Sequence, residues 1–154
     1  MKRLLLLLIV LIVLAPLVAI FYSGAPLTAS PGLFTRVHYY LTENEAATEQ
    51  ASAWPEREPL QARRPPEQVY QAVRATVSAM DWQVSAENPG DFTIHAVAST
   101  PLLAFKDDVR IRVETLDDGG TLVHVYSASR VGKVDFGRNS ARLLRFREAL
   151  ARRL

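Results

Sequence analysis

The sequence predicts an α+β fold, a two-layer sandwich in which two helices cover one face of a four-stranded antiparallel sheet. Two observations support this prediction. After residue 62, apolar residues recur at helical spacing in the first and last segments, whereas they alternate with polar residues in the segments between. Short turns containing glycine and aspartate separate the alternating segments, as expected for strands joined by hairpins. The predicted order is therefore helix, four strands, helix, preceded by an N-terminal transmembrane helix.

An apolar segment near the start of the chain predicts that first helix. Residues 4–21 contain no charged side chain and follow a basic start, and at about 1.5 Å per residue they are long enough to span a bilayer. The alternative for residues 1–25 is a cleaved secretory signal, because Ser23 and Ala25 nearly supply the small residues of a cleavage site. Pro26 would then follow the cut, which disfavours cleavage. Either way, we expect the N-terminus in the cytoplasm and the C-terminal domain outside it, at the inner membrane.

The next part of the chain, residues 26–62, is predicted to be a linker with short helices. Leu33 to Leu41 has apolar residues at helical spacing, and Thr42 to Glu45 fits a capping box ahead of another helical turn. Residues 55–66 are rich in proline and charge, which is typical of an extended connector. The charge balance then changes from acidic to basic, so the globular domain is placed at residues 63–154.

The elements of this domain follow from periodicity and turns. We expect a helix over 66–80, strands over 82–87, 92–98, 108–115 and 121–129, and a helix over 140–154. The third strand alternates most clearly, with Val109, Ile111 and Val113 facing one way and charged residues facing the other. About ninety residues are enough for one such core.

Composition excludes several classes of function. The chain has no cysteine, which rules out disulfides, thiol catalysis and a four-cysteine zinc site. A net charge of +2 is too small to indicate a nucleic-acid partner. His38, His95 and His124 lack metal-ligand spacing, and no Gly-x-Ser-x-Gly element is present. We therefore predict no catalytic residue, no metal and no cofactor.

A dense polar stretch at the joint between the last strand and the last helix is the strongest candidate for a site. It holds hydroxyls, charges and glycines, more hydrogen-bonding groups than a plain turn needs. The start of the helix and the nearby cations favour a phosphate or carboxylate ligand. With the polar face of the third strand, the candidate ligand-binding residues are Asp108, Arg112, Ser127, Ser129, Arg130, Gly132, Asp135, Gly137 and Asn139.

Two other interpretations stay open. Asp107, Asp108 and Asp135 could form a carboxylate cluster for a hydrolase-like or metal-dependent enzyme. The surrounding arginines and lysines favour structural ion pairs instead. The basic last helix, for its part, could contact anionic lipid or could simply be a solvated face.

Several of these motifs together resemble the domain-of-unknown-function 1499 family. The paired aspartates within Thr100 to Val113 are similar to that family, as is the Ser-Arg-x-Gly-x-x-Asp-x-Gly-x-Asn spacing from Ser129 to Asn139. The resemblance also takes in Glu58 to Leu60 and the helix over 66–80, so it covers most of residues 58–154. The Asn-Cys-Val-Ser-type segment common in members is missing here. The family implies domain boundaries, but no reaction, substrate or cofactor.

The sequence as a whole favours a membrane-anchored, exported domain that crosses the membrane once through residues 4–21. Its expected role is that of a non-enzymatic binding or envelope interaction module. The expected partner is an anionic ligand or an envelope protein, and not nucleic acid.

Overall fold

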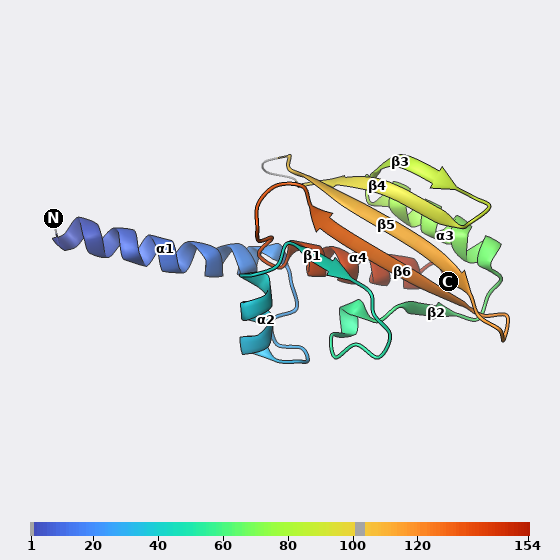
Figure 1. Ribbon diagram of the computed structural model, residues 1–154, viewed down its shortest axis with the longest axis horizontal. Coiled ribbons are helices and arrows are strands. Elements are labelled where there is room, and N and C mark those ends of the chain that lie inside the picture. Colours follow the sequence, from blue (N-terminus) through green and yellow to red (C-terminus); the bar gives the residue numbers. More distant parts are fainter. Residues whose placement is uncertain (1, 101–103) are drawn as a thin grey trace.

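The computed structural model describes residues 2–100 and 104–154, with the side chains of all of these except residues 4–8. Figure 1 shows a long helix that extends from a body with a sheet and covering helices. The elements in order are α1 (Lys2–Ser23), α2 (Leu33–Tyr40), β1 (Glu45–Ala47), the 3-10 helix η1 (Pro55–Arg57), β2 (Leu60–Ala62), α3 (Pro66–Ala79), β3 (Gln83–Asn88), β4 (Thr93–Ser99), β5 (Lys106–Thr115), β6 (Thr121–Ser129) and α4 (Arg138–Ala151).

The sheet has six strands, so the prediction of a four-stranded sheet is wrong. The strand order is β1-β6-β5-β4-β3, and β2 also pairs with β6; every pair is antiparallel. The two additional strands occupy different halves of the same edge of β6, with Glu45 opposite Ala128 and Leu60 opposite Val123. Each has only three residues. A segment that short carries no readable alternation, which is why the sequence pattern did not reveal it.

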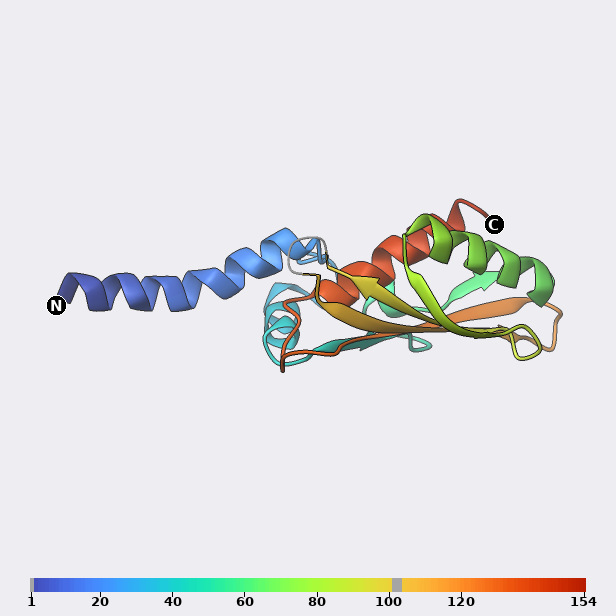
Figure 2. The ribbon, with the colours of Figure 1, turned by 90° about the horizontal axis from the view of Figure 1, so that it is seen from above.

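Helices α3 and α4 cover one face of the sheet, as Figure 2 shows from above. Both have an apolar stripe at helical spacing that packs on the inward side chains of the central strands. Trp82, between α3 and β3, stacks on Phe146 of α4 with ring centroids 5.6 Å apart. The buried core includes Val69, Val73 and Val77 from α3, Leu143, Phe146 and Leu150 from α4, and Ile94, Val109, Ile111, Val113 and Val123 from the sheet. The opposite face of the sheet is left uncovered by helices.

The prediction of an N-terminal transmembrane helix is also wrong. Helix α1 continues through Pro16 to Ser23, yet no helix among the described residues is long and apolar enough to cross a membrane. Its last turns belong to the body, because Ile20 and Ser23 are buried there. The apolar run counted along the sequence thus includes residues that the fold uses for packing.

A second, smaller core fixes the end of α1. Ile20 packs there with Tyr40 of α2 and with Trp54, the residue ahead of η1. At its centre lies Arg36, fully buried, whose Nη1 and Nη2 donate to the carboxylate of Glu56 at 2.6 Å and 3.0 Å. The guanidinium also donates to the Tyr40 hydroxyl and lies 4.5 Å from the centre of the Trp54 ring. This ion pair joins α2 to η1 beneath the last turn of α1.

Candidate functional site

Asp135 organises the joint between β6 and α4. Its carboxylate accepts the backbone N–H of Gly137 at 2.8 Å and that of Asn139 at 2.7 Å, which satisfies donors at the start of the helix. Burial raises the pKa of Asp135, while these N–H groups oppose the shift. Gly137 has φ 82°, and a Cβ there would lie 2.8 Å from that of Ala25, so this turn needs glycine. Asp135 thus acts as a helix cap.

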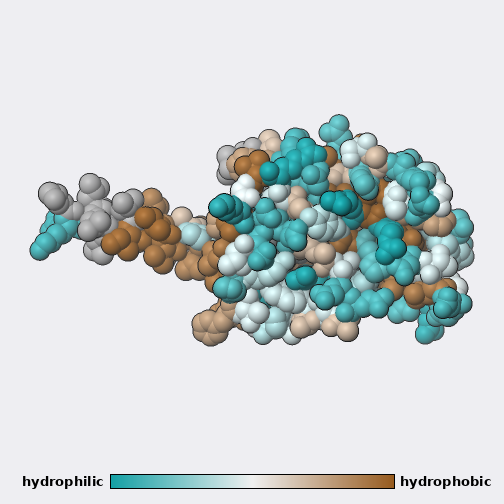
Figure 3. All heavy atoms as spheres, in the orientation of Figure 1, coloured by the Kyte–Doolittle hydropathy of each residue, from teal (hydrophilic) through white to brown (hydrophobic). Residues whose placement is uncertain are grey.

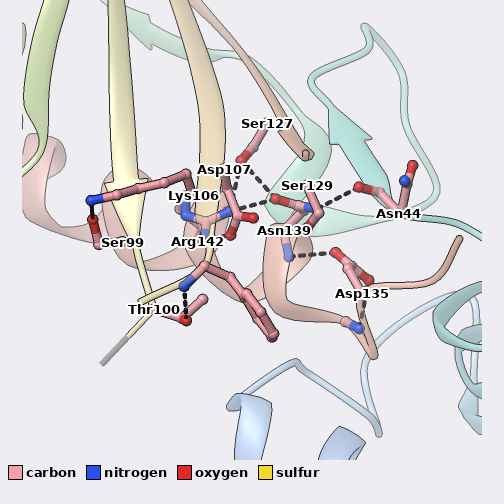
Figure 4. A network of polar contacts seen from close by, with 12 residues as sticks. Asn44, Ser99, Thr100, Lys106, Asp107, Ser127, Ser129, Asp135, Asn139 and Arg142 are labelled. Atoms are coloured by element: carbon pink, nitrogen blue, oxygen red, sulfur yellow. Dashed lines mark hydrogen bonds and ion pairs between the residues drawn. The ribbon is translucent and has the colours of Figure 1, made fainter. Parts of the chain in front are cut away.

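Asn139, in the first turn of α4, is the centre of a buried polar network (Figure 4). Its Nδ2 donates to the carbonyl oxygen of Asn44 at 2.7 Å and to Ser129 Oγ at 3.3 Å. Its Oδ1 accepts the Ser127 hydroxyl at 2.7 Å and also accepts a hydrogen bond from Arg142. The network therefore ties α4 to β6 and to the residue just ahead of β1.

Arg142 is the part of this network that borders an open space. Its guanidinium forms an ion pair with the buried Asp107 and donates to Ser127 Oγ at 2.8 Å. Figure 4 shows both partners on the sheet side of the arginine. Because Asp107, Ser127 and Asn139 surround it, the guanidinium has a fixed position before any ligand arrives.

The open space is a pocket of about 340 Å³ between the end of α1, the end of β4 and one side of α4. We call it the arginine pocket, since Arg138, Arg142 and Arg145 all line it. The remaining lining residues are hydroxyl-bearing or apolar, with no carboxylate and no histidine among them; they are Tyr22, Ser23, Met80, Trp82, Ala98, Ser99 and Thr100.

The arginine pocket carries a net positive charge. Arg142 is neutralised by Asp107, but neither Arg138 nor Arg145 forms a salt bridge with any residue that the structure describes. Partial desolvation, together with the charge of Arg142, lowers the pKa of Arg145. Two cationic side chains are thus available to a ligand.

Five of the predicted site residues do come together, but inside the fold. Ser127, Asp135 and Asn139 are buried, and Ser129 is half-buried beside them. Their hydrogen bonds go to one another, to Arg142 or to the backbone, and Gly137 contributes a backbone N–H. These residues hold the joint and position Arg142, and none of the five lines the arginine pocket.

The other predicted residues lie elsewhere. Arg130 and Asp108 form an ion pair with Nη2 2.6 Å from Oδ1; both side chains are about half exposed, and the pair lowers the pKa of Asp108. Arg112 pairs with Glu114 at 2.9 Å on the uncovered face of the sheet. Gly132 lies in the loop before α4, where its carbonyl oxygen accepts Asn44 Nδ2 at 2.8 Å. None of these four residues lines the arginine pocket.

The carboxylates proposed for an enzyme are separated and already engaged. Asp107 pairs with Arg142, Asp108 pairs with Arg130, and Asp135 caps α4. Within the described ranges, no group of three or more His, Asp or Glu side chains is arranged to hold a metal ion. The carboxylate-cluster interpretation therefore loses the residues on which it depended.

The arginine pocket itself was missed by the sequence analysis, although a signal was present. Arg142 and Arg145 are three residues apart in the helix predicted over 140–154, and Arg138 lies four residues before Arg142, so a helix extended to Arg138 places all three on one side. The hydroxyls of Ser99 and Thr100 could not be assigned to the same place, because they are distant in sequence. The basic helix was considered only as a lipid-facing or solvated surface.

Comparison with protein families finds a match over most of the chain. The model of a family described as "Protein of unknown function (DUF1499)" matches residues 39–150, which is most of the chain. The matched range includes the buried network and all three arginines of the pocket, and it leaves α1 outside. No curated protein matches the chain.

Proposed function

This chain belongs to the DUF1499 family, as the sequence motifs predicted, and we propose that its domain is a non-enzymatic module that binds an anionic ligand in the arginine pocket. The observation that carries the proposal is the pocket's charge. Three arginines line it, none of the lining residues carries a carboxylate, and only Arg142 has an acidic partner among the described residues.

The chemistry of the lining suits a phosphate or a carboxylate. A guanidinium offers several N–H donors in a planar fork that can bind two oxygens of an anion at once. Arg138 and Arg145 supply the net positive charge, while Arg142, held in place by the buried network, forms a rigid part of the lining. Since the buried network already holds Arg142, binding loses little side-chain entropy at that residue.

Two hydroxyls add further donors. Ser99 Oγ accepts a hydrogen bond from Lys106 Nζ at 2.6 Å, and Thr100 Oγ accepts the backbone N–H of Phe105 at 3.0 Å. A hydroxyl that accepts one hydrogen bond still has a proton to donate. Both protons can therefore be directed at an anion in the arginine pocket.

The lining also favours binding over catalysis. An acid–base mechanism needs a group that exchanges a proton near neutral pH, such as a histidine or a carboxyl group with a raised pKa. Neither type is found among the residues that line the arginine pocket. The alternative of a carboxylate-dependent enzyme is not supported by this chemistry.

The test is isothermal titration of the full chain with inorganic phosphate, in the unmodified protein and two variants. Arg145→Gln removes a charged donor from the arginine pocket and should weaken binding about 10–100-fold, the equivalent of about 1.5–3 kcal/mol. Arg153→Gln is the matched control, because it removes the same charge from the C-terminal end of the chain outside the pocket; its affinity should change less than about twofold. Equal losses in both variants, or no binding by the unmodified protein at about 10 mM phosphate, would contradict the proposal.

A further inference from the structure

The position of the arginine pocket at the end of an apolar helix points to the class of its ligand. Tyr22 and Ser23, the last residues of α1, form one of its walls. We propose, building on the anion-binding function above, that the ligand is an anionic amphiphile: a phosphate monoester in the pocket, with an alkyl or acyl chain that lies along α1.

The head group follows from the number of donors. Arg138 and Arg145 are without acidic partners in the described part of the chain, and the hydroxyls of Ser99 and Thr100 have protons to donate. A phosphate monoester presents three terminal oxygens and about two negative charges, whereas a carboxylate presents two oxygens and one charge. The charge and the donors of the arginine pocket therefore match the monoester better.

The apolar part of the ligand follows from the surface next to the pocket. Met80, Trp82 and Ala98 form an apolar inner wall. On the outer side, Tyr22 is 82% exposed and its ring meets that of Phe21 edge-on at 5.7 Å. An alkyl chain on the ligand would cover the exposed apolar surface of Phe21 and Tyr22, which a bare phosphate would leave in water.

A path for the alkyl chain of the ligand continues along α1. Residues one turn before Tyr22 and Ser23 lie on the same side of the helix, and Val18 is in that turn with 51% of its surface exposed. Leu11, seven residues before Val18 and therefore on the same side, is 64% exposed. The distance from Leu11 to Tyr22 is about 16.5 Å at 1.5 Å per residue, enough for an extended alkyl chain. Figure 3 shows a largely apolar surface along the part of α1 next to the body.

The experiment is a titration of the full chain with butyl, hexyl and octyl phosphate, all below their micelle concentrations. Each methylene that becomes buried is expected to raise the affinity by up to about fourfold. The double variant Leu11→Ser/Val18→Ser should flatten this dependence and leave the affinity for butyl phosphate unchanged. The matched control is Val13→Ser/Leu17→Ser, which removes two exposed aliphatic side chains, 56% and 43% exposed, from the other side of α1 and should behave like the unmodified protein.

The outcomes separate this inference from the proposed function. Equal affinity for butyl and octyl phosphate, or equal effects of the two double variants, would overturn the amphiphile and leave anion binding intact. A chain-length dependence that persists in Arg145→Gln with undiminished affinity would overturn both, because the charge of the arginine pocket would then play no part. An increase with chain length that is lost only in Leu11→Ser/Val18→Ser would support the inference.

Discussion

Asn139→Ala should destabilise the fold, although Asn139 is not one of the residues that line the arginine pocket. The substitution removes three hydrogen bonds that link α4 to Asn44, Ser127 and Ser129, and a fourth within α4 from Arg142. Some of these partners keep other bonds: the Asn44 carbonyl oxygen still accepts the N–H of Ser129, and Arg142 keeps Asp107. The Ser127 hydroxyl, however, is fully buried and loses its acceptor. At about 1–3 kcal/mol for a buried group left without its partner, the expected loss is about 1–3 kcal/mol.

The assay is urea unfolding of the full chain, followed by tryptophan fluorescence, because Trp82 packs against α4 and reports on its docking. Asn88→Ala is the matched control, since the Asn88 side chain also hydrogen-bonds but lies in an exposed turn. It should cost less than about 1 kcal/mol. If Asn139→Ala costs no more than Asn88→Ala, the buried network does not hold the joint, and the structural role assigned to it is wrong.

Four further predictions concern the joint, its buried charge and the location of the domain. Gly137→Ala should lower the melting temperature more than Gly132→Ala, because both have positive φ but only Gly137 also lacks room for a Cβ. Arg142→Met should cost about 3–5 kcal/mol in chemical denaturation by leaving Asp107 charged and buried, and Asp107→Leu in the same chain should recover most of that loss. Because burial raises the pKa of Asp135, the folded state binds the proton of this carboxyl group more tightly than the unfolded chain does. The contribution of Asp135 to the free energy of unfolding should therefore fall as the pH rises from about 3.9, its value in the unfolded chain, through the folded pKa. Thermal unfolding of Asp135→Asn should lack this pH dependence. A C-terminal alkaline phosphatase fusion should be active if the domain is exported as predicted, and an inactive fusion would contradict that prediction.

Local patterns predicted the long elements of the fold. The alternation around Ile111 and the hairpin turn at Gly119 and Gly120 identified β5 and β6 to within a few residues, because one face of each strand is buried and the other is solvated. The apolar stripes of α3 and α4 were visible for the same reason. The two short strands, β1 and β2, depend on pairing with β6, and no local pattern encodes that.

The candidate site, too, combines features that a local pattern predicts with features that depend on distant contacts. The polar density from Ser127 to Asn139 correctly indicated a place where many side chains meet, but the sequence could not tell whether they meet a ligand or each other. The answer depends on Asn44, which bonds to Asn139 from 95 residues away. The arginine pocket likewise needs the end of α1 and the end of β4 side by side, an arrangement that only tertiary packing provides.

The pairing of β6 with β1 and β2 also bears on how the protein folds and on which fragments of it would stay soluble. Residues 45–62 close the outer edge of β6, although much of the chain separates them from this strand in sequence. Contacts between such distant residues form slowly, so this closure should be a late folding step. A fragment that begins at residue 63 would keep both covering helices and the four long strands. It would also leave the backbone N–H and C=O groups along one edge of β6 unpaired, a surface on which a second copy could add its own strand.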